Sequence, residues 1–390
     1  ILLAHAAPNL ADITSDVQTP VYYGDVLAST ALAATASPSV AGGVFALGPY
    51  GVSYDHDGLV NYTATINDVT AAWTTARPTS AKLVYALPIR AGAGNGPSGL
   101  IWGVEALLRM TFVGGSTVFN FDQMTSAYSL LSSQAIIEYD GIFYWPGIDH
   151  FLSFNGIIQE VENSLNQNWF FDNLNYTHAQ KVFAIKVPRW GEIWWCYPRG
   201  SATECTHAVI YNVRLSKLLG YGVWYDTQLP NGGRSAGQFA RVFRRPLMAG
   251  VDAESGLYKL WEHEFEVDEL DGINVRAIQS YFETNAIWAA DAEKPTNNGI
   301  YVDYIEPDFV QSGDMSVTVR GSMSNSRAPQ SDSTPIFFPD TATSSDDQLV
   351  YLREQRRQMR FRFESNVTGG NYEMGDTVAQ VRPGDARITS

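Results

Sequence analysis

The chain has 390 residues, of which 45% are hydrophobic, 13% aromatic and 17% charged, and its formal net charge is −15. This hydrophobic content is ample for a large core, and no apolar run reaches the roughly 18 residues of a membrane-spanning helix. The acidic excess argues against tight nucleic-acid binding, which depends on Lys and Arg displacing counterions from phosphates. The acidity either only aids solubility or forms a surface that nucleic acid passes without sticking, and both interpretations stay open.

Two segments that begin 98 residues apart resemble each other: GVFALGPYGVSYDHDGLV at 43–60 and GIFYWPGIDHFLSFNGII at 141–158. An ungapped alignment places identical residues at three positions, Gly43/Gly141, Phe45/Phe143 and Gly58/Gly156. Similar apolar, aromatic bursts stand at 100–102, 193–195 and 257–261. The sequence therefore indicates a repeated structural unit.

The spacing of these bursts suggests the size of the unit. Between the markers Phe45, Ile101, Phe143, Ile193 and Leu257 the steps are 56, 42, 50 and 64 residues. A period near 50 residues corresponds to about four short strands with their turns, which is one β-propeller blade. We therefore expect an all-β chain that forms one β-propeller of about six blades over 1–390. Because it begins ILLAHAAPNL, without Met or a basic stretch, we expect this domain to be truncated at its N-terminus and to carry no signal peptide.

Several further segments predict strands. IIEYDGIFYW at 136–145 and AVIYNV at 208–213 are rich in β-branched and aromatic residues. In MRFRF at 359–363, Met359, Phe361 and Phe363 are expected on one face, and Arg360 and Arg362 on the other.

One segment departs from the strand pattern. Ile157, Val161, Leu165 and Trp169 recur every four residues, the spacing of a helical face. The pattern predicts a helix over 157–170, inserted between blades, with Asn155 placed to cap it.

Two segments are expected to be irregular: the small-residue stretch at 91–99 and the Ser/Thr/Asp/Pro-rich stretch at 324–348, which contains one apolar island, IFF. The second is predicted to be an extended loop. Such loops either contact neighbouring molecules or are simply mobile, and both interpretations stay open.

The two cysteines, Cys196 and Cys205, flank a short hairpin-like segment, so a cross-strand disulfide is geometrically possible. Two cysteines provide neither a disulfide framework nor a four-ligand zinc site. We expect free, buried thiols in a protein made in a reducing cytoplasm.

No motif indicates catalysis. None of the six histidines stands in a metal-binding spacing, and neither a nucleophile elbow nor a P-loop occurs. His150 is expected to be packed and hydrogen-bonded, and the segment 55–58 to be a turn rather than a calcium loop. Carboxylates are numerous, so the pair of catalytic carboxylates that a glycosidase needs stays an open alternative. We expect no enzyme, no cofactor and no metal site.

An acidic run stands at 262–269. Its alternation with apolar residues is typical of the solvated face of a strand. The alternative, which is more specific, is that the run forms the acidic lining of a channel. The residues concerned are Glu262, Glu264, Glu266, Asp268 and Glu269.

The segment 100–156 resembles the tail nozzle, or packaged-DNA stabilisation, proteins of short-tailed bacteriophages. Its matching positions are Trp102, Gly115, 118–121, Ser132, Ser133, 143–147, Asn155 and Gly156. Two further matches lie at 192–198 and at the C-terminal end, where Gly369, Gly370, Gly375, Pro383, Gly384, Asp385 and Arg387 fill the family positions. The resemblance spans roughly residues 20–390.

This resemblance implies a β-propeller subunit of the virion, six to a ring, which retains the packaged genome and then conducts it during ejection. The implied partners are other copies of the chain, the adaptor and portal proteins of the connector, tail fibres or a plug, and DNA in transit without specific binding. The protein would be made in the host cytoplasm and would have no membrane span.

The motif residues would have mechanical roles. Trp194 and Trp195 are neighbours on one strand and point to opposite faces, so one is expected between blades and the other against a neighbouring blade or subunit. The resemblance places Trp102, Phe143, Trp145, Asn155, Gly156, Gly384, Asp385 and Arg387 with them as structural or interface residues.

Two alternative functions remain open. A receptor- or sugar-binding tail protein would gather its aromatic side chains in an open pocket, whereas a nozzle would bury them between strands and subunits. A polysaccharide-degrading propeller would instead show two carboxylates about 5–10 Å apart in a cleft.

Overall fold

The computed structural model describes residues 2–4, 21–25, 28–31, 42–65, 68, 70, 72–89, 96–115, 117–163, 167–229, 231–240, 242–271, 273–288, 298–322, 330–339 and 349–386. Antiparallel strands dominate these residues, which confirms the expected all-β class. The chain divides into two compact units, Ile1–Glu264 and Phe265–Ser390. This division corrects the expectation of one domain over 1–390, because each unit has apolar clusters of its own.

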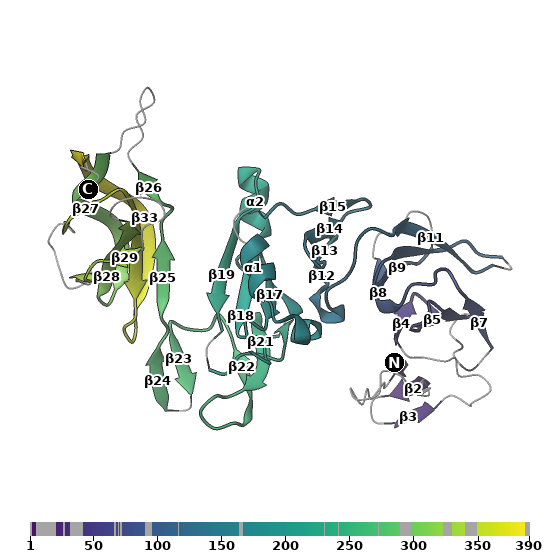
Figure 1. The fold of residues 1–390 in the computed structure, drawn as a ribbon. Helices are drawn as coiled ribbons and strands as arrows, with labels where there is room; N and C mark the ends of the chain where they lie inside the picture. Colours follow the sequence, from purple (N-terminus) through teal and green to yellow (C-terminus); the bar gives the residue numbers. More distant parts are fainter. Residues whose placement is uncertain are drawn as a thin grey trace. The chain divides into compact units, whose positions relative to one another are not determined.

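Among the described residues of the first unit, six sheets follow one another, and in each the strands pair antiparallel in sequence order (Figure 1). The strands are β1 (Leu2–Ala4), β2 (Val21–Asp25) and β3 (Ala28–Ala31); β4 (Gly43–Leu47), β5 (Tyr50–Tyr54), β6 (Val60–Thr63) and β7 (Trp73–Ala76); β8 (Leu83–Ile89), β9 (Ser98–Gly103), β10 (Leu107–Phe112) and β11 (Phe119–Thr125); β12 (Ile137–Tyr139), β13 (Ile142–Pro146), β14 (Phe151–Phe154) and β15 (Ile158–Glu160); β16 (Phe183–Val187), β17 (Glu192–Tyr197), β18 (His207–Asn212) and β19 (Trp224–Gln228); and β20 (Ala236–Ala240), β21 (Arg245–Val251) and β22 (Tyr258–Glu262).

Four consecutive four-stranded sheets, from β4 to β19, confirm the predicted repeat of four short strands. Ile101, Phe143 and Ile193 lie on the second strands of three successive sheets, so the steps of 42 and 50 residues measure the repeat itself. Phe45 lies on a first strand and Leu257 precedes a third strand, which explains the longer outer steps. The similar segments 43–60 and 141–158 form β4–β6 and β13–β15. They are the first three strands of one sheet and the last three strands of another, so the two segments do not occupy equivalent positions.

Neighbouring sheets of the first unit bury apolar faces against each other. Val52 and Tyr62 of sheet β4–β7 share a buried cluster with Met110 and Phe119 of sheet β8–β11. The first strands of neighbouring sheets also lie side by side, as β4 does with β8 and β16 with β20. This serial stacking is propeller-like, but the described residues show no closed ring, and the blade number stays a prediction.

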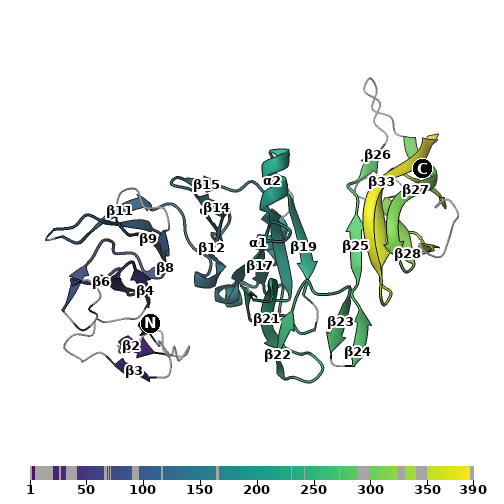
Figure 2. The same ribbon diagram turned by 180° about the vertical axis from the view of Figure 1, so that it is seen from behind.

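The second unit is a two-layer sandwich rather than a series of blades (Figures 1 and 2). One layer has the order β25-β32-β28-β29 with β26 and β30 beside it, the other has the order β31-β27-β33, and β23 and β24 form a separate hairpin. The strands are β23 (Asp268–Asp271), β24 (Asn274–Ala277), β25 (Ser280–Glu283), β26 (Ile287–Trp288), β27 (Asn298–Ser312), β28 (Met315–Ser322), β29 (Ser331–Asp332), β30 (Ile336–Phe338), β31 (Val350–Arg356), β32 (Gln358–Ser365) and β33 (Asn371–Ala386).

The alternation predicted at 359–363 is confirmed on β32. Met359, Phe361 and Phe363 are buried in the sandwich core, and Arg360 and Arg362 alternate with them. The same alternation on β28 supplies the paired strand with Val317 and Val319 toward the core. The period of two therefore identified this core strand correctly.

The helix predicted over 157–170 is wrong. Residues Ile158–Glu160 form β15, which pairs with β14, and the nearby helix α1 covers Gln167–Asn173 instead. Asn155 does not cap a helix, because its Oδ1 accepts the N–H of Ile157 (3.4 Å) in the turn before β15. The other helical elements are α2 (Val213–Leu219) and the 3-10 turns η1 (Ser133–Ala135) and η2 (Tyr176–Lys181).

The stretch 324–348 is not loop throughout. Within it β29 and β30 pair with β28, and Phe338 of the apolar island is buried in the sandwich core. Residues 324–329 and 340–348 lie outside the described residues, as do 91–95 of the small-residue stretch.

Candidate functional sites

Three aromatic residues of the segment 100–156 fill the interface between sheets β8–β11 and β12–β15. Trp102 on β9 lies 5.8 Å, between ring centroids, from both Phe143 and Trp145 on β13. All three side chains are buried, with at most 5% of their surface exposed. Rings at this separation contribute packing beyond the burial of area alone.

Trp194 and Trp195 on β17 face opposite sides of their sheet, as predicted. Trp195 packs toward sheet β12–β15 against Phe151 (5.1 Å between centroids), and its Nε1 donates to the carbonyl oxygen of Ala135 (2.9 Å). Trp194 belongs to the cluster that contains Met248 of sheet β20–β22. Each of the two rings therefore fills a different interface between neighbouring sheets.

Glu192, beside these tryptophans, is a buried carboxyl group that the sequence alone did not single out. Trp194 Nε1 donates to Oε2 (2.8 Å), and the Tyr225 hydroxyl donates to Oε1. Burial raises the pKa of Glu192 to about 7, the Trp194 N–H lowers it in part, and the nearby Glu264 carboxylate raises it further. Near neutral pH this carboxyl group is therefore partly protonated.

A raised carboxyl pKa next to a second carboxylate is also the mark of an acid–base catalyst. Here, however, both oxygens of Glu192 accept protein hydrogen bonds, and Glu264 Oε2 accepts one from Trp190 Nε1 (2.9 Å). Glu192 is almost completely buried. The arrangement is suited to holding a proton within the protein and presents no carboxyl oxygen to a substrate.

The acidic run 262–269 does not form one face of one strand, which corrects that expectation. Glu262 ends β22 and Asp268 begins β23, and the boundary between the two units falls after Glu264. Its carboxylates have separate partners: Glu262 pairs with Arg245 (2.9 Å), Glu269 pairs with Arg276 (3.6 Å), and Asp268 accepts the N–H of Gly369 (2.8 Å). A channel-lining role for Glu262, Glu264, Glu266, Asp268 and Glu269 stays a prediction.

Two glycines of the resembling motifs occupy positions that need glycine. Gly156 has φ +114° in the turn before β15, a conformation that L side chains rarely adopt. A Cβ on Gly384 would lie 2.9 Å from Gln355 Cδ and 3.0 Å from the carbonyl oxygen of Gly299. Asp385 lies within β33, but its side chain and the whole of Arg387 are outside the described residues.

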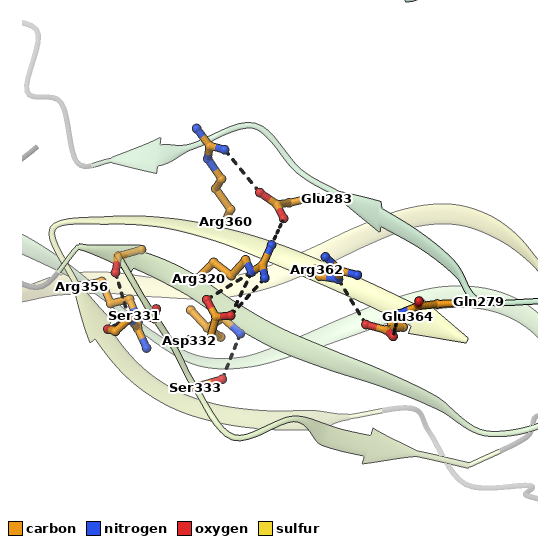
Figure 3. Close-up of polar contacts among 12 residues, drawn as sticks. Gln279, Glu283, Arg320, Ser331, Asp332, Ser333, Arg356, Arg360, Arg362 and Glu364 are labelled. Carbon is orange, nitrogen blue, oxygen red and sulfur yellow. Dashed lines mark hydrogen bonds and ion pairs between the residues drawn. The ribbon is translucent and has the colours of Figure 1, made fainter. Parts of the chain in front are cut away.

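A ladder of ion pairs covers the outer face of the first layer of the sandwich (Figure 3). Glu283 on β25 bridges Arg320 (3.0 Å) and Arg360 (3.3 Å). Arg320 also holds Asp332 through two nitrogens, and Arg362 pairs with Glu364 (3.2 Å). Because carboxylates of the sheet itself engage these guanidinium groups, the ladder is suited to joining strands rather than to binding an external anion.

The described thiols and histidines show no catalytic arrangement. Cys196 and Cys205 are free and buried, as expected, and burial raises the pKa of Cys205 to about 12, which keeps its thiol unreactive. His150 is hydrogen-bonded to Asp149 (2.6 Å) but is partly exposed rather than packed in a strand. Asp55 closes the turn at 55–58 by accepting the N–H groups of Asp57 and Leu59, each at 2.9 Å.

Two other kinds of feature are absent from the described part of the chain. No group of three or more His, Cys, Asp or Glu side chains is placed to hold a metal ion. No helix there combines the length and the apolar content needed to cross a membrane.

The outer edge of sheet β20–β22 is an exposed apolar surface. Four earlier sheets have a fourth strand, but no described strand pairs with the far side of β22. Leu257, Tyr258 and Leu260, at or next to this edge, are 65%, 82% and 68% exposed. We call these three residues the β22 edge. An unprotected edge strand that carries large apolar side chains is a site for association.

Comparisons with known proteins give no family. No protein-family model and no curated protein matches the sequence. Among solved structures, the chain is similar to a provisionally assigned 6-phosphogluconolactonase from Bacteroides uniformis (9% identity, TM-score 0.40, 64% of this chain and 78% of that chain). It is also similar to Sqt1 from Saccharomyces cerevisiae (6%, 0.32, 73% and 86%) and to a glycoside hydrolase (11%, 0.25, 86% and 96%). TM-scores this low carry no argument about function.

Proposed function

We propose that the chain is a structural subunit of a virus particle, of the tail-nozzle type that its sequence resembles. The observation that carries the proposal is the position of the motif aromatics: Trp102, Phe143, Trp145, Trp194 and Trp195 are all buried between sheets. A sugar-binding protein that used these rings would need them in an open pocket. Their burial favours a rigid scaffold, because each ring fixes one sheet against the next.

The β22 edge supports the assembly of such scaffolds. A sheet with three described strands, with Tyr258 and Leu260 exposed on the last of them, can accept a strand or an apolar face from another subunit. A contact of this kind between different surfaces of identical chains closes into a ring when the rotation between neighbours allows it. The proposal therefore includes a homo-oligomeric ring, expected to be a hexamer.

In this proposal the ring is a passive conduit in the phage tail. It would join the adaptor and portal proteins, hold a plug or tail fibres, retain the genome and then conduct it. The net charge of −15 would oppose adhesion of DNA in transit. We assign no enzymatic activity to the ring. The buried Glu192 agrees with this, because both of its carboxyl oxygens accept hydrogen bonds from Trp194 and Tyr225.

Size-exclusion chromatography with light scattering, followed by electron microscopy of the purified protein, tests the proposal. We expect closed rings with a central opening. Replacing Tyr258 and Leu260 together by Lys should convert the rings to monomers, because the charges cannot be buried at a subunit contact. The matched control is Ile148→Lys, which places one charge at an exposed apolar position in the turn between β13 and β14.

The control variant should still form rings. A chain that is monomeric at all concentrations, or that assembles only into open fibres or compact dimers, would contradict the nozzle proposal. Rings that persist in the Tyr258/Leu260 variant would remove the β22 edge from the assembly while leaving the nozzle itself intact.

A further inference from the structure

A polar pocket with aromatic walls lies between sheets β12–β15 and β16–β19 of the first unit. Its volume is about 240 Å³, below the roughly 300–1,000 Å³ of sites for drug-sized ligands. We call it the tyrosine pocket. Its lining consists of Ile142, Tyr144, Ser153, Asn155, Gln159, Glu160, Val161, Glu162, Tyr211 and Gly222.

Two tyrosines form its aromatic part. The ring centroids of Tyr144 on β13 and Tyr211 on β18 are 5.9 Å apart, and the ring planes are inclined by 50°. Burial raises the pKa of Tyr144 to about 12, so its hydroxyl group keeps its proton at neutral pH. Tyr144 is buried and Tyr211 half-buried, so the pair forms a fixed aromatic wall, and tyrosine hydroxyl groups can donate and accept hydrogen bonds.

The remaining polar lining is rich in acceptors. Its residues are Ser153, Asn155, Gln159, Glu160 and Glu162. The Ser153 hydroxyl already donates to the carbonyl oxygen of Gln159 (3.3 Å), and Asn155 Oδ1 accepts the N–H of Ile157 (3.4 Å), which leaves Gln159 and the two glutamates as the main polar side chains for a ligand. Amide side chains donate and accept hydrogen bonds and carboxylates accept them, so together they can serve the closely spaced hydroxyl groups of a sugar, each of which both donates and accepts.

The charges of the lining determine which sugar fits. Glu160 and Glu162 are the carboxylic acids of the lining, and among the described residues no Lys or Arg belongs to it. His150 lies 3.8 Å from Glu160 and offsets part of one charge, while Glu162 lies outside that pair. From the two carboxylates, the tyrosine pair and the small volume, we propose that the tyrosine pocket binds an amino sugar of monosaccharide size. The inference does not depend on the nozzle proposal.

Ligand-observed NMR and calorimetric titration of the full chain at neutral pH test this inference. The probes are glucosamine, N-acetylglucosamine and glucuronic acid, which differ in charge on a similar ring. We expect glucosamine to bind about tenfold more tightly than N-acetylglucosamine, because its ammonium group makes charge-assisted hydrogen bonds, which are stronger than neutral ones. Glucuronic acid should not bind, since both carboxylates repel it.

Two variants locate the site. Replacing Glu160 and Glu162 together by Gln keeps the shape of two exposed side chains and should reduce glucosamine affinity about tenfold or more. The matched control Glu105→Gln removes one exposed carboxylate elsewhere in the first unit and should change nothing. Absence of glucosamine binding, equal binding of glucuronic acid, or binding unaffected by the Glu160/Glu162 variant would each overturn the proposal, whether or not the chain forms rings.

Discussion

At the scale of single residues, the least predictable feature is the protonation of Glu192. Its sequence neighbourhood, GEIWW, resembles any strand that begins with a surface glutamate. Only the fold places Trp194 and Tyr225 on its oxygens and Glu264 nearby, so the raised pKa is a product of tertiary structure. Gly58 is the opposite case. Asp-Gly signals a tight turn by itself, and the structure confirms it with φ +78° and only 2.1 Å between an added Cβ and the Thr79 carbonyl oxygen.

The raised pKa of Glu192 predicts a loss of stability as pH rises. Below about pH 4.5 the group is protonated in both states and costs nothing. Between the unfolded value of 4.5 and the folded value of about 7, the unfolded chain releases the proton while the folded chain keeps it, so unfolding becomes easier. Replacing Glu192 by Gln, which imitates the protonated acid, should remove about 2 kcal/mol of this loss.

Urea unfolding at pH 5 and pH 8 measures this difference. Relative to the wild type, the Glu192→Gln variant should gain stability at pH 8 but not at pH 5. Glu105→Gln serves as the control, because Glu105 is exposed, and it should follow the wild-type curve at both values. An equal effect of Glu192→Gln at the two pH values would show that the carboxyl group is ionised throughout.

At the scale of elements, period-two patterns gave correct strands, whereas the four-residue spacing at 157–169 gave a false helix. Ile157 and Trp169 are exposed and Val161 is buried, so the spacing does not describe one apolar face. The stronger signal was Asn155-Gly156, a dipeptide typical of hairpin turns, which here leads from β14 into β15. Pairing with β14 satisfies the backbone of β15, and this tertiary contact outweighs any local helical preference.

The alternation on β17 leads to a prediction about the joints between sheets. Trp195→Ala should destabilise the first unit by about 3–5 kcal/mol, because it empties a fully buried site and leaves the Ala135 carbonyl oxygen without its N–H donor. Trp190→Ala, close by in sequence, should cost about 1 kcal/mol or less, since Trp190 is 46% exposed.

Free energies of unfolding from urea titrations compare the two variants. Near-ultraviolet circular dichroism of the folded variants provides an independent readout, since buried tryptophan in a fixed environment dominates that signal. A small cost for Trp195→Ala, similar to that of Trp190→Ala, would mean that the interface between sheets β12–β15 and β16–β19 is not held by this ring.

At the scale of the whole chain, the repeat of four strands was readable and the boundary between units was not. Bursts such as those around Ile101, Phe143 and Ile193 recur because each second strand carries large apolar residues toward neighbouring sheets. The boundary lies within the acidic run at 262–269, whose alternation predicts one continuous strand. In the structure, however, the chain leaves sheet β20–β22 in this run and begins the second unit. The sandwich that follows shares the alternation of the earlier strands, so local patterns could not distinguish the two architectures.

Because the two units have separate apolar clusters, they should unfold in separate transitions. Phe361→Ala removes a buried ring from the sandwich and should lower one calorimetric transition by roughly 10 °C, while the other stays in place. Phe151→Ala, the matched substitution in the first unit, should lower the other transition instead. If both substitutions shifted a single common transition, the two units would be one cooperative body, and the boundary at Glu264 would have no thermodynamic meaning.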